Sequence, residues 1–360
     1  MIIKKYQKYL VATYFYHFII VSIIFLCLGF ILNFFEELKF FDDHEVVSYY
    51  PFLLALLNIP SVLFDLFPFI FLITTKFFYI YLNDKNEIEI LKNNGISYFK
   101  ILSILSISSI VAGIIILLFY YTFSSNLKSH YYNIKNNFSD QSEYLAVVNE
   151  SGLWIKEEID ETVNIIHAKK FKENSIEKIT ITQTNSKFKT PNTIIAEKAN
   201  ISRKSWNLIN VKIINHKGQN NNLPTFGYNS SFNGEIIANL FSNLNSLNLY
   251  QLYELAENYS KIGYSTTDVM VHINKLYSMP FFFLLMTLLG FLIMVKFKFI
   301  KTKLFTVVIG VIVSVIVYYI NYFSSMFGTN ETLPISLSIW LPHLILLLIC
   351  SLAMVRVNEL

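Results

Sequence analysis

The chain has 360 residues, of which 54% are hydrophobic and only 15% are charged, and its formal net charge is +4. A soluble domain of this size carries about 25% charged residues, so the composition excludes an ordinary soluble domain and indicates an integral membrane protein. A small net charge without a basic nucleic-acid-binding signature gives no indication of a nucleic-acid partner. Cys27 and Cys350 both lie in apolar runs, which favours packing roles over a disulfide or metal site.

Three apolar runs in the first third of the chain predict membrane helices at residues 10–35, within 51–82, and at 98–123. Each is long enough for the roughly 20 residues that a bilayer requires. No small-residue cleavage site follows the first run, so we expect a retained helix and not a signal peptide.

Two charged residues, Asp65 and Lys76, interrupt the second run. Charges in membrane helices usually face a bundle interior or extend to the membrane surface. Lys76 lies near the inner end of the run, which favours the surface. For Asp65, a cavity-facing position and an interfacial one remain open.

A polar stretch at residues 83–97 separates the second run from the third. Asn83 or Asp84 can cap a short helix there, and Gly95 can end it in a left-handed conformation. We therefore expect a small helix at the membrane face. Two roles remain open: a simple connection between spans, or a docking helix for a separate protein.

The chain becomes polar at residue 124, and short segments alternate between apolar and polar residues. Such segments, divided by Gly, Asn and Pro, predict strands of a β-sandwich or jelly roll. Ile179 and Ile181 share one face, and Ile209 is expected on the same face as Val211. The predicted strands are at residues 143–148, 153–157, 162–171, 179–182, 193–201 and 209–213.

Three more membrane helices are predicted, at residues 276–295, 304–323 and 335–355. The fold class is thus an α-helical membrane protein with six transmembrane helices and an all-β, jelly-roll-like extracytoplasmic domain inserted between helices 3 and 4. The expected divisions are 1–123, with the coupling helix at 83–97, then 124–265 for the β domain, and 266–360 for the last three helices.

The basic residues indicate the orientation of these helices. With six spans and the amino terminus inside, the short outer loops carry only Lys39. The positive-inside rule therefore predicts cytoplasmic termini and a β domain on the opposite side. The short inner segments carry Lys4, Lys5, Lys8, Lys85, Lys92, Lys100, Lys296, Lys298, Lys301, Lys303 and Arg356.

The chain lacks the sequence motifs of common catalytic sites, including phosphate loops, zinc-protease motifs and nucleophile elbows. We expect no catalytic residue, no metal site and no cofactor of its own. A membrane protein without a nucleotide site can still be driven by a separate ATPase that docks on the helix at 83–97.

An ordered set of short motifs runs through the whole chain. The segments are Phe35-Glu36-Glu37-Leu38-Lys39, Ile59-Pro60, Phe67-Pro68, Asn86-Glu87-Ile88 with Gly95, Gly152-Leu153-Trp154-Ile155-Lys156, Lys275-Leu276-Tyr277-Ser278-Met279-Pro280, Met286-Thr287-Leu288-Leu289-Gly290, Leu333-Pro334 and Trp340-Leu341-Pro342. In this order and spacing the set resembles the LptF/LptG (YjgP/YjgQ) family of lipopolysaccharide export permeases, and the Gly152-Leu153-Trp154 motif favours the LptG side of this family.

The resemblance implies a multi-pass protein of the bacterial inner membrane with its β domain in the periplasm. It implies a heterodimer with an LptF-like permease, seated on an LptB-like ATPase dimer that binds the ATP. The complex would extract lipopolysaccharide and pass it to LptC-like and LptA-like periplasmic proteins. Spans one and five would line the lipid cavity and the seam with the partner permease.

The resemblance also implies two groups of site residues. Glu87 would contact the ATPase, with Ile88, Ile90 and Leu91 as apolar footing and Gly95 ending the helix. At the outer mouth, Lys39 matches a basic position expected to attract the anionic head group. Asn33 stands where LptG-type sequences have lysine, and with Glu36 nearby this end is more acidic than the family pattern.

Two other functions remain open. One is a permease for another lipid or for a lipoprotein. The other is a membrane sensor or scaffold whose outer β domain binds a partner.

Overall fold

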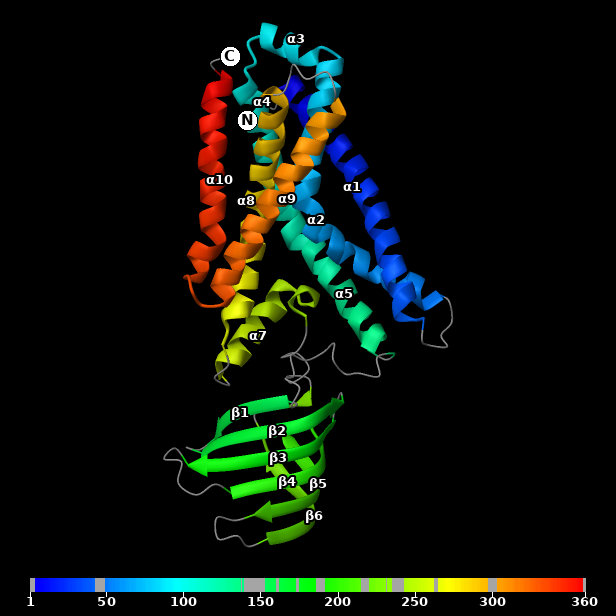
Figure 1. The fold of residues 1–360 in the computed structure, drawn as a ribbon, viewed down its shortest axis with the longest axis vertical. Helices are drawn as coiled ribbons and strands as arrows, with labels where there is room; N and C mark the ends of the chain where they lie inside the picture. Colours follow the sequence, from blue (N-terminus) through cyan, green and yellow to red (C-terminus); the bar gives the residue numbers. More distant parts are fainter. Residues whose placement is uncertain are drawn as a thin grey trace. The chain divides into compact units, whose positions relative to one another are not determined.

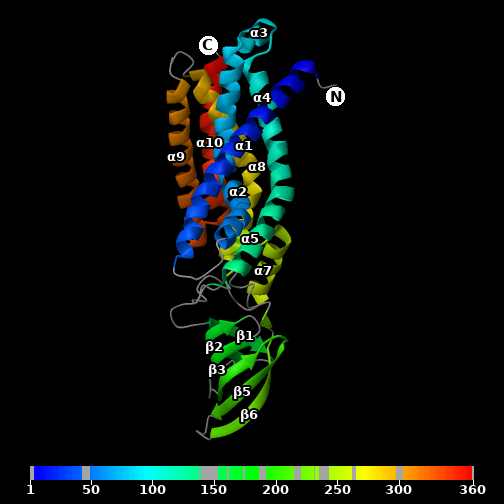
Figure 2. The same ribbon diagram turned by 90° about the vertical axis from the view of Figure 1, so that its right-hand side faces the viewer.

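The computed structural model describes residues 4–42, 49–136, 138, 153–159, 162–172, 175–185, 192–214, 220–230, 232–234, 243–261, 265–296 and 303–358. The chain divides into two compact units. One comprises Met1–Tyr131 with Met270–Leu360 and is helical, and the other, Tyr132–Val269, contains a β-sheet. The helices and strands of both are labelled in Figure 1 and Figure 2.

Six helices of the described residues are long and apolar enough to cross a membrane, which confirms the six expected spans. A short helix, α3 (Glu87–Asn93), lies between the second and third of them. The six are α1 (Lys5–Phe40), α2 (Tyr49–Asp84), α4 (Tyr98–Ile115) continued by the π-helical turn η1 (Ile116–Tyr120) and α5 (Tyr121–Asn136), α8 (Thr267–Lys296), α9 (Lys303–Thr329) and α10 (Ile335–Asn358).

The third span continues beyond its expected end at Phe123, because α5 carries the helix to Asn136. Its polar sequence resembles a loop, yet Ser125 and Tyr131 are buried. The Tyr131 hydroxyl donates a hydrogen bond of 2.8 Å to the fully buried Glu37 carboxylate of α1. Contact with α1 thus stabilises helical structure that composition does not predict.

A cluster of hydroxyl groups connects four helices in the helical unit. The Tyr14 hydroxyl of α1 lies 3.4 Å from Thr75 Oγ1 of α2, 3.3 Å from Ser109 Oγ of α4 and 3.1 Å from Thr287 Oγ1 of α8. All four residues are fully buried. Because lipid provides no hydrophobic drive between membrane helices, such bonds help to hold them together.

Small residues allow close contact in the same bundle. A Cβ atom on Gly113 of α4 would lie 2.7 Å from the Pro280 Cα atom of α8, and one on Gly290 of α8 would lie 2.7 Å from the Leu72 carbonyl oxygen of α2. Both contacts are with backbone, which cannot move aside. The glycines therefore allow α8 to approach α2 and α4 closely.

The second unit contains a six-stranded antiparallel sheet in which each strand pairs with its neighbour in sequence. It confirms a β-sheet domain between the third and fourth spans, to which a helix at Leu249–Lys261 is added; the strand expected at 143–148 lies outside the described residues. The elements are β1 (Leu153–Ile159), β2 (Thr162–Lys172), β3 (Ser175–Asn185), β4 (Asn192–Asn200), β5 (Ser205–Ile214) and β6 (Asn220–Asn229), followed by η3 (Leu244–Ser246) and α7 (Leu249–Lys261).

A row of irregular positions crosses the sheet, and the alternation of inward-facing and outward-facing side chains along the strands changes phase there. Lys178 of β3 and Asn210 of β5 both have a φ of 54° and no ladder partner in the described pairings. The expectation that Ile209 shares a face with Val211 is therefore wrong: Val211 is 2% exposed and Ile209 is 41% exposed. Ile179 and Ile181 are both buried, as predicted. The pairing register is the same on both sides of the row, so no described strand carries the extra residue of a bulge, and the sheet is strongly curved (Figure 1 and Figure 2).

Hydrogen bonds join the two edge strands of the described sheet. The Glu157 carboxylate of β1 accepts bonds of 2.6 Å from the Tyr228 hydroxyl of β6 and 2.9 Å from the Ser230 hydroxyl. All three residues are buried. Burial and the adjacent carboxylate raise the pKa of Tyr228 well above its usual value, so this hydroxyl remains a donor. The curvature thus brings β1 and β6 within side-chain contact.

Replacing Tyr14 with Phe removes the oxygen at the centre of the hydroxyl cluster. We expect the free energy of unfolding to fall by about 1 kcal/mol, since membrane hydrogen bonds contribute roughly 0.6 kcal/mol each. The cost is limited because Thr75, Ser109 and Thr287 also bond to carbonyls of their own helices. Denaturant titration in mixed micelles measures the change. Tyr16→Phe, at a 62% exposed position of the same helix, is the control, and an equal loss in both variants contradicts the prediction.

Candidate coupling and lipid-binding sites

Helix α3 is short, but both of its ends are well defined. Asn86, which has a φ of 56°, is the N-cap residue, and its side chain makes no capping hydrogen bond. The prediction that Asn83 or Asp84 caps the helix is therefore wrong. At the other end Gly95 has a φ of 76°, and its N–H bonds to the Lys92 carbonyl at 2.9 Å. The Ile96 N–H bonds to the Leu91 carbonyl at 3.0 Å, which completes a Schellman motif. The predicted left-handed ending at Gly95 is confirmed.

The apolar residues of α3 face different environments. Ile88 is 3% exposed, Leu91 is half-buried and Ile90 is 56% exposed. Helix α3 contacts α2, so Ile88 anchors α3 within this chain. Of these three residues, which were expected to make apolar contact with the ATPase, Ile90 has the largest exposed apolar surface.

The Glu87 side chain has a partner within the chain. The Tyr9 hydroxyl of α1 lies 2.8 Å from Glu87 Oε2 and 3.0 Å from Oε1. Nearby, Lys85 Nζ donates a bond of 2.6 Å to the Tyr81 hydroxyl. That bond, with the Glu87 charge as a smaller cause, raises the pKa of Lys85. Glu87 is half-buried, and the polar cluster around it draws on α1, α2 and α3.

Sequence reasoning missed Tyr9 because the two residues are 78 positions apart. No local spacing connects a tyrosine near the start of α1 with a glutamate of α3. Only the packing of the two helices brings their side chains together.

The three candidates at the far end of α1 have different environments. Glu36 and Lys39 are exposed, whereas Asn33 is 7% exposed. Asn33 Nδ2 donates to the Gly29 carbonyl at 3.0 Å, and Asn33 Oδ1 accepts from Asn58 Nδ2 at 2.5 Å. The Asn58 oxygen in turn accepts from Lys128 Nζ. Asn33 therefore joins α1 to α2, and it does not present a free side chain to a ligand.

The two charged residues of α2 are in contrasting positions. Lys76 is fully buried and its Nζ donates to the Thr306 carbonyl of α9, so the expectation that it extends to the membrane surface is wrong. The absence of a side chain at Gly310 makes room for it, since a Cβ there would collide with the ammonium group. Asp65 is exposed, with Lys275 and Lys128 within electrostatic range.

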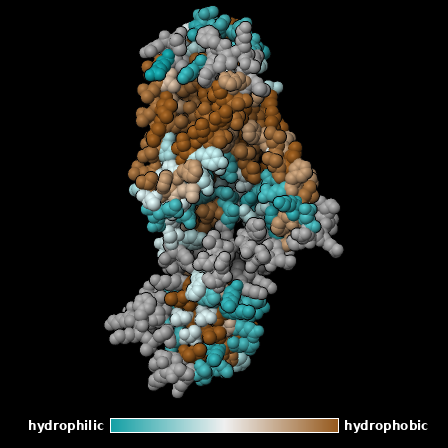
Figure 3. All heavy atoms as spheres, viewed as in Figure 1, coloured by the Kyte–Doolittle hydropathy of each residue, from teal (hydrophilic) through white to brown (hydrophobic). Residues whose placement is uncertain are grey.

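The helices differ greatly in how much of their apolar surface the chain itself covers. Within the most apolar stretch of each, 67% of α8 and 61% of α2 is buried, but only 17% of α1 and 22% of α9. Figure 3 shows the broad hydrophobic surface of the helical unit. Helices α1 and α9 therefore expose apolar faces suited to lipid or to a second membrane protein.

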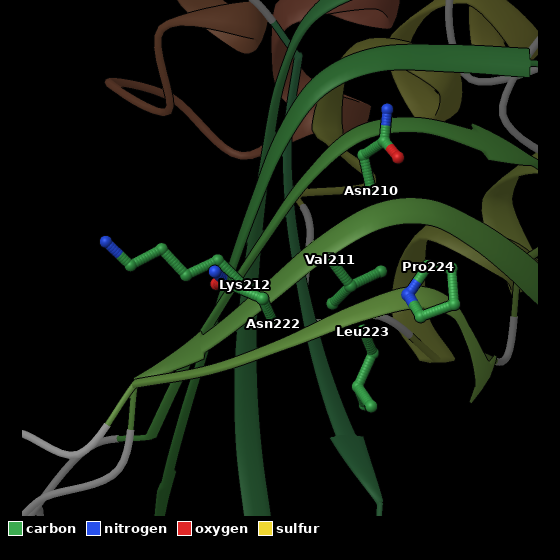
Figure 4. A pocket seen from close by; sticks show the side chains of 6 residues that line it. All are labelled: Asn210, Val211, Lys212, Asn222, Leu223 and Pro224. Carbon is green, nitrogen blue, oxygen red and sulfur yellow. The ribbon is translucent and has the colours of Figure 1, made fainter.

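The inner face of the β-sheet is strongly apolar. Its buried side chains come from every described strand, and they include Ile155, Ile166, Ile179, Ile181, Ile194, Leu208 and Val211. A hollow of about 340 Å³ lies beside Asn210 and Val211 (Figure 4). Lys212 extends away from it (Figure 4). The hollow lies at the irregular row between β5 and β6 and holds no titratable pair suited to catalysis.

The residues that the structure describes contain no group of three His, Cys, Asp or Glu side chains placed to hold a metal ion. No curated protein matches the chain. The family described as lipopolysaccharide export system permease LptF/LptG matches residues 8–356. This match covers almost the whole chain and spans both units. The chain therefore belongs to the LptF/LptG family of lipopolysaccharide export permeases, which are transport subunits of the inner membrane.

Proposed function

We propose that the chain is a permease subunit of an ATP-driven lipopolysaccharide exporter, and that α3 is where a separate LptB-like ATPase dimer acts. The observation that carries the proposal is the construction of α3. Ile88 fixes the helix to the bundle and Ile90 is exposed to a partner, while the half-buried Glu87 carboxylate beside it is bonded to the Tyr9 hydroxyl. An anchored helix can transmit a push or pull from a docked protein to the spans on either side.

The orientation of the chain follows from its basic residues. Lys85, Lys92 and Lys100 lie on or beside α3, at the end of the bundle expected in the cytoplasm. We therefore assign both termini to the cytoplasm and the β domain to the periplasm. ATP would be bound by the partner, and the permease itself would carry no cofactor.

A second permease subunit, LptF-like, would cover the exposed faces of α1 and α9. Membrane helices with little burial in one chain are suited to a seam with another. The heterodimer would enclose a lipid cavity, with Lys39 as the cation nearest the anionic head group and the exposed Glu36 beside it. The Gly152-Leu153-Trp154 motif supports assignment of this chain to the LptG position.

The apolar inner face of the sheet would receive acyl chains. Hydrophobic contact is non-directional, which suits a lipid that must slide. LptC-like and LptA-like proteins would then take the cargo onward. A lipoprotein or another lipid is the competing cargo, and a sensor or scaffold is the competing role.

Glu87→Arg tests the coupling site. Reversing the charge should abolish co-purification of the full-length permease with the soluble ATPase, because a cationic partner surface would then be repelled. Glu89→Arg, an exposed position of the same helix, is the matched control and should retain the complex. Undiminished co-purification of the Glu87→Arg variant with the ATPase would contradict the assignment of α3 as the docking site.

A photo-crosslinking residue on the inner face of the sheet tests the cargo. Leu223 of β6 pairs with the inward-facing Val211, whereas Ile195 of β4 follows the buried Ile194 and faces outward. Both are 39% exposed, which makes Ile195 a matched control. We expect crosslinks to lipopolysaccharide in cells from position 223 and not from 195. Crosslinks to lipoprotein alone would overturn the proposed cargo.

A further inference from the structure

The bond between Tyr9 and Glu87 has a specific geometry. A phenol carries one hydrogen, yet the Tyr9 oxygen lies 2.8 Å and 3.0 Å from the two oxygens of the same carboxylate. Nearly equal distances put the hydroxyl in the fork between the oxygens. The single hydrogen is therefore shared between both acceptors.

The fork of a carboxylate is also the position that a bidentate cation requires. A guanidinium group binds a carboxylate through two parallel N–H bonds, one to each oxygen. Both oxygens must then face the incoming group. In this structure Tyr9 occupies that side of Glu87, so a hydroxyl of the chain itself stands where a partner's cation would bind.

The link also joins two different parts of the chain. Tyr9 lies in the second turn of α1 and is 42% exposed, so its ring has room to move away from Glu87. Glu87 opens α3, which Ile88 anchors to the bundle. A change in the bonding of the Glu87 carboxylate would therefore act directly on α1, without passing through α2 or α4.

We propose that Tyr9 is a positioning residue that competes with a cation of the docking protein for the Glu87 carboxylate. When the partner docks, its cation binds between the two Glu87 oxygens in place of the Tyr9 hydroxyl. The bond that joins α1 to α3 is then lost. This inference rests on the proposed docking role of Glu87. It adds a route by which docking acts on α1, the span of which the chain itself buries the smallest share.

The test measures the affinity of the soluble ATPase for the full-length permease complex in nanodiscs. Tyr9→Phe keeps the ring but removes the competing hydroxyl, so the ATPase should bind about fivefold more tightly, as expected for loss of one competing hydrogen bond. Tyr16→Phe, on the exposed side of the same helix, should leave the affinity unchanged.

A double-mutant cycle separates competition from a general effect on folding. In a Glu87→Gln background, binding should be weaker than in wild type, and adding Tyr9→Phe should then change it little, because the competed charge is gone. Weaker or unchanged binding with Tyr9→Phe alone overturns the inference while leaving the docking role of Glu87 intact. Unchanged binding with Glu87→Gln overturns both.

Discussion

Hydrogen bonds attach α1 to the other helices of the bundle, together with aromatic packing against α2, where Phe18 lies beside Phe67 and Phe71. Water drives apolar helices together, but lipid does not, so a membrane helix needs close small-residue contacts or polar bonds to stay in place. Little of α1 is buried within this chain. It is nevertheless bonded at three levels: at Tyr9 near its start, at Tyr14 in the hydroxyl cluster, and at Asn33 and Glu37 near its end.

This arrangement suits a helix that is attached to the bundle and can still change position. A single hydrogen bond can be replaced by a bond to a partner while the other bonds remain. The bonds of Asn33 and Glu37 fix the far end of α1 to α2 and α5. The bond of Tyr9 at the other end is the most exposed of the set, and it meets the helix on which we propose that the ATPase acts.

Much of the fold follows from patterns that are local in sequence. The length of apolar runs predicted six membrane helices, and alternation predicted strands such as the one that buries Ile179 and Ile181. The ending of α3 was predictable because only glycine readily adopts the positive φ observed at Gly95. Strand β6 was missed, because Pro224 and Gly227 are unusual in strands and are tolerated here at the edge of the described sheet.

Features that depend on distant contacts could not be predicted. The shift in face occurs at Asn210, whose positive φ alternation cannot reveal, so Ile209 was assigned to the wrong side. From the sequence alone, Lys76 resembles a surface lysine. Its burial depends on the space at Gly310 and on the Thr306 carbonyl of α9, which are both distant in sequence. The helical extension to Asn136 and the Tyr9–Glu87 pair likewise depend on tertiary packing.

The central claim is that α1 is held by exchangeable bonds and that docking on α3 loosens its first turns. Hydrogen–deuterium exchange of the full-length permease complex in nanodiscs, with and without the ATPase, measures this directly. The structure predicts faster exchange in the first turns of α1 when the ATPase is bound, with no change at the buried hydroxyl cluster around Tyr14. Slower or unchanged exchange in those turns would contradict the claim.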